Sequence, residues 1–227
     1  MKTIRALEVL GEYTEGQWGL VTAAQARVSE IDGVSLLRLV EYGLLERVVR
    51  GVYAVRSAPV SPFRAEQAAW LSLAPDKPAW ARSKLDRDSG VISHRSATKL
   101  HGIGDFVANQ VDIMVLRRRT TRLSSVSLHL GELDEHEVVL IDGLPVTNVE
   151  RTVLDLLADH VDAGHVATVI RQGLETGGLD LDVLRSRTER YARRYGVKTR
   201  AGMSFLEYLL AHIGVEITDI ATQDQRK

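Results

Sequence analysis

The clearest pattern of apolar and polar positions lies near the N-terminus, in residues 20–55, and predicts two short helices followed by a β-hairpin. Thr22 stands where a helix cap is needed, directly before a segment in which apolar and polar residues alternate at helical spacing. Ser, Asp and Gly in residues 29–33 then supply stop and turn residues. The pattern predicts a first helix with the apolar positions Ala23, Ala26 and Val28.

A second helix is predicted after this turn, because apolar residues recur at helical spacing as far as Gly43, which we expect to end the helix. The positions expected to be buried are Leu36, Leu37, Leu39, Val40 and Leu44. The positions expected on the other faces are Ser35, Arg38, Glu41 and Tyr42.

A hairpin follows the second helix. Residues 44–49 and 52–55 are rich in β-forming side chains, and Arg50-Gly51 between them is a turn signal. We expect this hairpin to project and to present Arg47 and Arg50. An earlier helix over residues 4–13 would complete a three-helix core. Residues 1–56 are therefore predicted to form a winged helix-turn-helix.

Charge and shape together bear on whether this segment binds DNA. Residues 1–56 contain seven Lys or Arg and seven Asp or Glu, so the segment has no net basic charge. Phosphate binding requires only a local basic face. We expect DNA contacts from the second helix and the wing, at Ser35, Arg38, Tyr42, Arg47 and Arg50. The alternative is a winged helix that serves as a protein-interaction module and binds no nucleic acid.

The rest of the chain predicts a second, larger domain, so that the fold class is α+β. Two prolines and two serines in residues 57–62 favour a short extended linker. Residues 63–227 are predicted to mix strands and helices to about residue 160 and to be helical from about residue 162. The expected helices cover 64–73, 94–100 with Ser93 as cap, 149–157, 164–175, 181–195 and 203–213, and the expected strands cover 111–116, 126–130, 138–141 and 144–146.

Composition excludes several classes of site. The chain has 227 residues, of which 44% are hydrophobic and 26% charged, as is ordinary for a globular protein with a real core. It contains no cysteine, which excludes disulfides, thiolate catalysis and cysteine-ligated metals. The first residues lack an apolar signal region, and no run approaches the roughly 20 apolar residues that span a bilayer, so we expect a cytoplasmic protein.

Two stretches carry a family resemblance. Residues 92–102 (ISHRSATKLHG) and 142–156 (DGLPVTNVERTVLDL) are similar to the two signature stretches of AbiEi-type antitoxins, the regulatory halves of type IV toxin–antitoxin pairs. The resemblance implies a dual role. Such proteins repress their own operon by binding repeated operator sequences through the winged helix, and they neutralise a nucleotidyltransferase-like toxin through the C-terminal domain. Repeated operators suggest cooperative binding of more than one copy.

The residues of these stretches are also explained by structural roles. His94 and His101 are two helical turns apart, about 10.5 Å along the axis, which is too far for one metal ion to join them. We therefore predict no metal site and no catalytic residues there. Arg151 and Asp155 stand at i and i+4 and are expected to pair on a helix surface, which contributes about 0.2–0.5 kcal/mol.

Two basic clusters lie in the second domain. Arg117, Arg118, Arg119 and Arg122 fall between two predicted strands, in an expected exposed loop. The second cluster includes Arg190, Arg193 and Arg194, and over residues 185–200 it has a local net charge of +6. Operator DNA, the tRNA that the toxin would modify and an acidic face of the toxin are its candidate partners. A solvated helix face balanced by acids elsewhere explains it equally well.

Two alternative functions stay open. In the first, the antitoxin acts enzymatically on its toxin, for example by phosphoryl transfer, although the sequence has no P-loop, no Gly-x-Gly-x-x-Gly loop and no kinase-like catalytic string. Asp112, Asp142, Asp155 and Lys99 are the groups that would hold a metal or phosphate in that case, and we predict no cofactor. A plain winged-helix regulator without a toxin is the other alternative.

Overall fold

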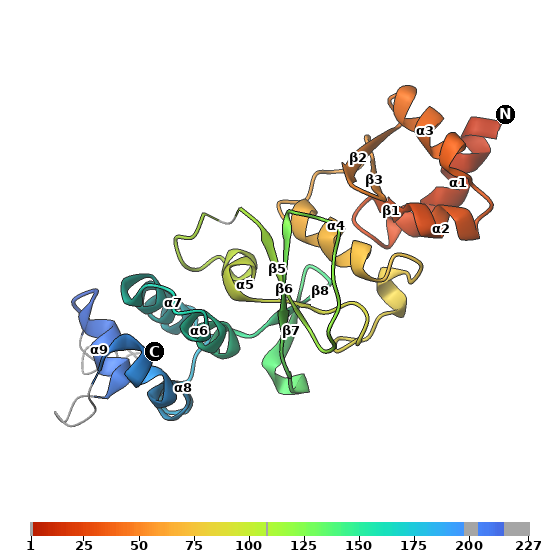
Figure 1. Cartoon of the computed structure of the whole chain (residues 1–227). Helices are drawn as coiled ribbons and strands as arrows, with labels where there is room; N and C mark the ends of the chain where they lie inside the picture. Colours follow the sequence, from red (N-terminus) through yellow and green to blue (C-terminus); the bar gives the residue numbers. More distant parts are fainter. Residues whose placement is uncertain (1, 108, 198–203, 216–227) are drawn as a thin grey trace. The chain divides into compact units, whose positions relative to one another are not determined.

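The computed structural model describes residues 2–107, 109–197 and 204–215 (Figure 1). They belong to two compact units, one of Met1–Ile92 with Asn109–Pro145 and one of Ser93–Ala108 with Val146–Lys227. The division into a winged helix, a linker and a third segment at residues 56 and 62 stays a prediction. Among the described residues, no helix combines the length and the apolar character that a membrane span requires.

The first unit begins with the predicted winged helix-turn-helix, which contains one strand more than the sequence pattern indicated. The elements in chain order are α1 (Lys2–Glu15), β1 (Leu20–Thr22), α2 (Ala23–Val28), α3 (Gly33–Glu41), β2 (Leu45–Val49) and β3 (Val52–Val55). The strands form an antiparallel sheet in the order β1-β3-β2, in which Val21 lies opposite Tyr53. Strand β1 escaped prediction because three residues are too few to show an alternating pattern.

The helices of this segment close over a small apolar core. Leu10 of α1, Ala26 of α2 and Leu36 and Leu39 of α3 are buried against Leu45 of β2. Thr22 is the predicted cap of α2: its hydroxyl accepts a hydrogen bond from the backbone N–H of Gln25, and the Gln25 side chain accepts one from Thr22 in return, which makes a capping box.

The remainder of the first unit is a mixed sheet with one long helix. Its elements are α4 (Arg64–Leu73), the 3₁₀ helix η1 (Ala79–Ala81), β4 (Val91–Ile92), β5 (Val111–Val115), β6 (Val126–Leu130), the 3₁₀ helix η2 (Glu135–Glu137), β7 (Val138–Ile141) and β8 (Leu144–Thr147), whose last two residues fall in the second unit. The strands follow the order β6-β5-β4-β8-β7, with β5 and β6 parallel and β4 and β5 antiparallel. This arrangement confirms the predicted α+β class.

Helix α4 connects the two sheets of the first unit, because it packs against β1, β2 and β3 on one side and against β4 and β5 on the other. Trp70 of α4 is fully buried and donates its indole N–H to the carbonyl of Gly90. The guanidinium of Arg82 lies 4.3 Å from the Trp70 ring centroid. It donates to the carbonyls of Trp70, Leu71, Ala74 and Lys77, so it caps the C-terminal end of α4.

A buried polar network also ties the winged helix to the chain beyond α4. Gln17 and Gln25 are both fully buried and exchange two amide hydrogen bonds of 2.9 Å. The Gln17 side-chain oxygen accepts from the backbone N–H of Ala79, and the Thr22 hydroxyl donates to the carbonyl of Pro75. Residues 1–56 are therefore held to residues 75–79 by partly buried hydrogen bonds, in addition to the chain connection through residues 57–62.

The second unit is helical. Its elements are α5 (His94–His101), α6 (Val149–Ala158), α7 (Ala163–Glu175), α8 (Leu181–Thr188), the 3₁₀ helix η3 (Glu189–Tyr195) and α9 (Phe205–Ala211). The single helix predicted over 181–195 is wrong in its second half, because the chain tightens into η3 after Thr188 and ends at Gly196 with positive φ. The helix predicted over 203–213 corresponds to α9, and its first predicted residue, 203, lies outside the described residues. Phe205 and Leu206 of α9 are buried in the core of this unit beside Val166 and Ile170.

Candidate nucleic-acid interface

Helix α3 is the second helix of the helix-turn-helix, and Asp32 caps its start. The Asp32 carboxylate accepts a hydrogen bond of 2.7 Å from the backbone N–H of Ser35. This bond, rather than any burial, lowers the pKa of Asp32, so the carboxylate stays ionised at the positive end of the helix dipole. Ser35 itself is half-buried, and its backbone is committed to this cap.

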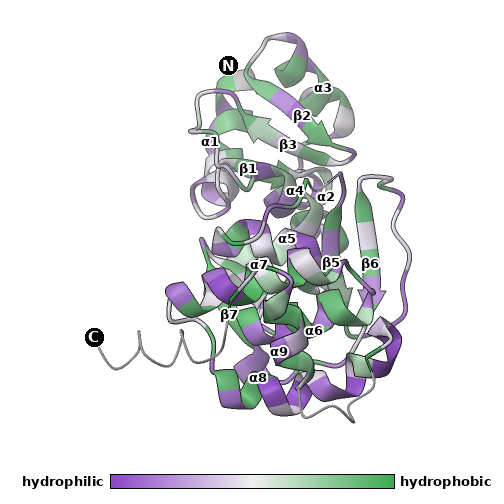
Figure 2. Ribbon diagram, turned by 90° about the vertical axis from the view of Figure 1, so that its left-hand side faces the viewer, coloured by the Kyte–Doolittle hydropathy of each residue, from purple (hydrophilic) through white to green (hydrophobic). Residues whose placement is uncertain are grey.

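The exposed face of α3 differs from the predicted one. Leu37, which we expected in the core, is 57% exposed, and Val34 is 56% exposed. At 100° per residue, five positions of α3 and its C-cap that have exposed side chains cover about 140° of the helix circumference. These positions are Val34, Leu37, Arg38, Glu41 and Tyr42. The prediction that Leu37 is buried is wrong, because the fully buried side chains of α3 are Leu36 and Leu39. Figure 2 colours parts of the α3 ribbon as hydrophobic.

The wing is a short hairpin. Val49 pairs with Val52 across the Arg50-Gly51 turn, and Gly51 has a φ of +81°, which its lack of a side chain allows without strain. The carbonyl of Gly51 accepts a hydrogen bond of 2.9 Å from the backbone N–H of Ala23 at the start of α2. The tip is thereby joined to the helix-turn-helix, and Arg47 and Arg50 are exposed.

An arginine outside residues 1–56 neutralises one of the acidic side chains of this segment. Arg64 of α4 forms an ion pair with Glu46 of β2, and the two side chains are 19% and 37% exposed. One of the seven acidic side chains of residues 1–56 is thus compensated by α4. Arg38, Arg47 and Arg50 are all exposed, and Glu41 and Asp32 are the acidic groups on the exposed part of α3 and its cap.

The first predicted basic cluster, which lies in the first unit, is only partly free for a ligand. Arg117 pairs with Asp88, while Arg119 donates to the backbone carbonyls of Asp88 and Leu73 and is half-buried. Burial is the main cause that lowers the pKa of Arg119. Arg119 therefore organises the loop, which the sequence did not indicate, whereas Arg118 and Arg122 are exposed.

The second basic cluster belongs to α8 and η3. Arg190, Arg193 and Arg194 are exposed in η3. The guanidinium of Arg190 lies 4.9 Å from the Tyr191 ring centroid, and Arg194 donates to the carbonyl of Ala158. Lys198 and Arg200, which contribute to the predicted local charge, lie outside the described residues.

The histidines of the first signature stretch are held by the fold. His101 donates through Nε2 to the carbonyl of Thr147 at 2.8 Å, and burial lowers its pKa more than this hydrogen bond raises it. His94 is buried, and its Nδ1 lies 2.9 Å from the hydroxyl of Ser93. Ser93 occupies the predicted cap position of α5 but makes no side-chain cap bond, and Gly102 ends α5 with positive φ.

The second signature stretch supplies a turn and the start of α6. Arg151 donates to Asp155 at 2.8 Å, but the two side chains are only 15% and 7% exposed, so the pair lies largely within the fold and not on its surface as predicted. Asp142, at φ +49°, accepts a 2.8 Å bond at its carbonyl from the Trp18 indole and another at its carboxylate from Gln67. Trp18 is a contact residue that the sequence pattern did not reveal.

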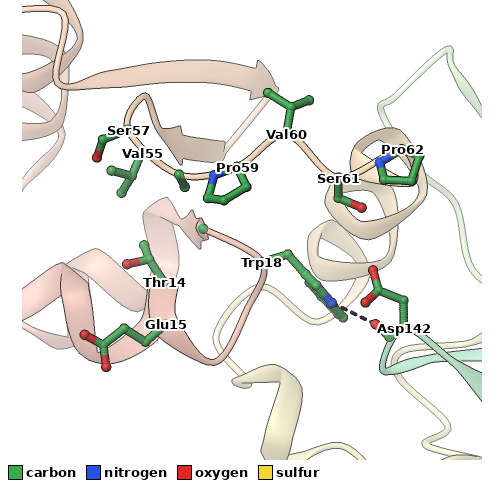
Figure 3. Close-up of a pocket in the computed structure, with 12 residues that line it drawn as sticks. Thr14, Glu15, Trp18, Val55, Ser57, Pro59, Val60, Ser61, Pro62 and Asp142 are labelled. Atoms are coloured by element: carbon green, nitrogen blue, oxygen red, sulfur yellow. Dashed lines mark hydrogen bonds between the residues drawn. The ribbon is translucent and has the colours of Figure 1, made fainter.

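Trp18 and Asp142 also line a pocket of the first unit. The pocket has a volume of about 570 Å³ and is bounded by the end of α1, by residues 55–62 and by Asp142. The Trp18 side chain extends toward Asp142 below Pro59 and Val60 (Figure 3). The predicted linker is therefore the wall of a pocket.

The carboxylates considered for metal or phosphate chemistry have partners within the protein. Asp112 lies 2.9 Å from Nε2 of His129, Asp142 accepts from Gln67, and Asp155 accepts from Arg151. These interactions give each carboxylate a role in the fold. Of the three residues, Asp142 contacts the winged helix, through Trp18.

The comparison with known protein families gives a match in the N-terminal part of the chain. Residues 12–56 match the family described as "Transcriptional regulator, AbiEi antitoxin". The AbiEi resemblance is confirmed in this segment. The match covers the helix-turn-helix and wing, whereas the two stretches on which the resemblance was first based lie outside it. No curated protein sequence matches the chain.

A solved structure shows a likeness of fold over nearly the whole chain. The crystal structure of RV2827C protein from Mycobacterium tuberculosis is similar with a TM-score of 0.53 and 17% identity. The similarity covers 92% of this chain and 77% of that chain. At this identity the comparison shows a shared fold and carries no information about ligands.

Proposed function

We propose that this protein is an AbiEi-type antitoxin that represses its own operon by binding operator DNA through α3 and the wing, and that neutralises a nucleotidyltransferase-like toxin with the remainder of the chain. The observation that carries the proposal is the coincidence of two independent features in residues 12–56. The segment matches an antitoxin family of transcriptional regulators, and its fold places α3 beside a hairpin with exposed arginines.

The geometry supports a specific division of contacts. The N-terminal part of a recognition helix meets base edges, and wing residues meet phosphates. Arg38 on α3 would therefore contact a base or a flanking phosphate, with Tyr42 farther along the same face and Ser35 at its edge. Arg47 and Arg50 would bind phosphates. Arg118, Arg122, Arg190, Arg193 and Arg194 remain candidate contacts to nucleic acid or toxin.

The test uses the full chain, because partly buried hydrogen bonds join residues 1–56 to residues 75–79. A duplex is first selected from a random pool with the purified protein. Arg38→Ala is expected to weaken binding to that duplex about tenfold in a mobility-shift assay, since one specific contact contributes about 1–3 kcal/mol. Arg171→Ala, which changes an arginine of α7 that pairs with Glu175, is the matched control and is expected to bind normally.

The same variants test the antitoxin role. A toxin of nucleotidyltransferase type, encoded next to this protein, is co-expressed with each variant from a separate promoter. Wild type and Arg38→Ala are both expected to restore growth, because repression and neutralisation use different parts of the chain. Loss of both activities in a folded Arg38→Ala variant would contradict this division. DNA binding without rescue by wild type would favour the second candidate, a winged-helix regulator without a toxin, which the restriction of the family match to residues 12–56 also permits.

A further inference from the structure

The exposed face of α3 is unusual for a surface helix because large aliphatic side chains occupy its first two turns. Val34 and Leu37 are both more than half exposed, although Leu36 and Leu39 already supply the buried face. A helix that packs by one face normally carries polar residues on the other. Exposed aliphatic side chains at the start of α3 therefore call for an apolar partner.

The charges on this face do not supply the recognition by themselves. Arg38 and Glu41 lie on the same exposed face, so their formal charges cancel. Tyr42, 66% exposed, adds a further largely apolar surface at the C-terminal end. A face of this composition gains little from phosphates and is suited to a groove that offers an apolar group.

The major groove of DNA offers such a group at thymine, whose C5-methyl group lies on the base edge. Val34 and Leu37 are three residues apart, which places them about 4.5 Å apart along the helix axis. Successive base pairs are about 3.4 Å apart. Side chains within one turn of each other, on a helix face that enters the groove, can meet methyl groups on the same or neighbouring base pairs.

We propose that Val34 and Leu37 recognise thymine methyl groups in the major groove, so that each operator half-site carries thymines beneath the first two turns of α3. The proposal rests on the function proposed above and specifies how the same interface selects its sequence. Arg38 supplies the polar contact next to the two aliphatic side chains.

The test replaces each thymidine of the selected duplex in turn with deoxyuridine, which keeps base pairing and removes only the methyl group. Burial of one methyl contributes about 0.8 kcal/mol, so wild type is expected to lose about fourfold in affinity at each contacted position, measured by fluorescence anisotropy. Val34→Ala and Leu37→Ala are each expected to bind the thymine duplex more weakly and to lose sensitivity at one of these positions. Val60→Ala changes a valine that is 71% exposed outside the winged helix, and it should retain the full sensitivity.

The outcomes separate the two proposals. If Arg38→Ala weakens binding while every deoxyuridine duplex binds like the thymine duplex, the thymine inference is wrong and DNA binding by α3 stands. If Arg38→Ala and both aliphatic variants leave the affinity unchanged, or no duplex is selected, both proposals fail. Self-association of wild type that is lost in Val34→Ala and Leu37→Ala, without a change in thymine sensitivity, would assign this face to a second copy and overturn the inference. Thermal melts of each variant check that the exposed substitutions leave the fold intact.

Discussion

The Gln17–Gln25 pair makes a sharp prediction about how the winged helix is held in the first unit. Gln25→Met keeps a similar volume in a fully buried position and removes the amide. The substitution takes away the acceptor of the Thr22 backbone N–H and one partner of the Gln17 amide nitrogen. Because Gln17 still donates to Leu20, its side chain is expected to stay in place.

The magnitude follows from the groups that lose their partners. A buried donor left without an acceptor costs about 1–3 kcal/mol, and Gln25→Met leaves two such hydrogens, one on Thr22 and one on Gln17. The capping box of α2 is lost as well. Loss of a helix cap typically costs about 1 kcal/mol, and part of this cost is already counted in the unpaired N–H of Thr22. Since methionine recovers some apolar burial, we expect the free energy of unfolding of the first unit to fall by about 3 kcal/mol.

Urea unfolding followed by tryptophan fluorescence is the appropriate assay. All three tryptophans (Trp18, Trp70 and Trp80) belong to the first unit, so the signal reports that unit alone. Gln110→Met provides the matched control, because Gln110 is an exposed glutamine of the same unit. A loss below about 1 kcal/mol for Gln25→Met, no larger than that of the control, would refute the importance assigned to this buried network.

Two further substitutions test other parts of the fold. Arg82→Lys should lower the free energy of unfolding of the first unit by about 2–4 kcal/mol. The reason is that an ammonium cannot replace five hydrogen bonds to four carbonyls or the stacking on Trp70. An unfolding curve like that of wild type would contradict the capping role. Burial lowers the pKa of His101, so as the pH falls below about 6.5 the imidazole is protonated in the unfolded state before it is protonated in the folded state. The free energy of unfolding therefore falls with pH between the pKa of the unfolded state and the lower pKa of the folded state. His101→Gln should reduce this fall in urea unfolding measured by circular dichroism between about pH 7.5 and 5.5, and an unchanged pH profile would show that other groups cause it.

Regular patterns in the sequence predict much of this fold. The periodicity of α4, α6 and α7 and the alternation of β5–β8 indicated these elements within one or two residues, because each is long enough to repeat its pattern. Strands β1 and β4 were not predicted, since three and two residues show no repeat.

Contacts between distant segments could not be predicted in the same way. The Gln17–Gln25 pair depends on how the loop before β1 folds, and the bond of Trp18 to Asp142 joins residues 124 positions apart. For the same reason the sequence did not indicate that Arg119, expected in an exposed loop, donates to backbone carbonyls of two other segments. The exposure of Leu37 depends on which face of α3 meets the core, and spacing alone leaves that choice open among adjacent apolar residues.

We propose that α3 and the wing form the surface that binds DNA. Amide hydrogen exchange of the full chain, measured with and without the selected duplex, locates that surface directly. We predict slower exchange in peptides that cover residues 33–51 when DNA is bound, with the largest change at the Arg50-Gly51 turn. Slower exchange confined to other segments, with residues 33–51 unchanged, would contradict the account.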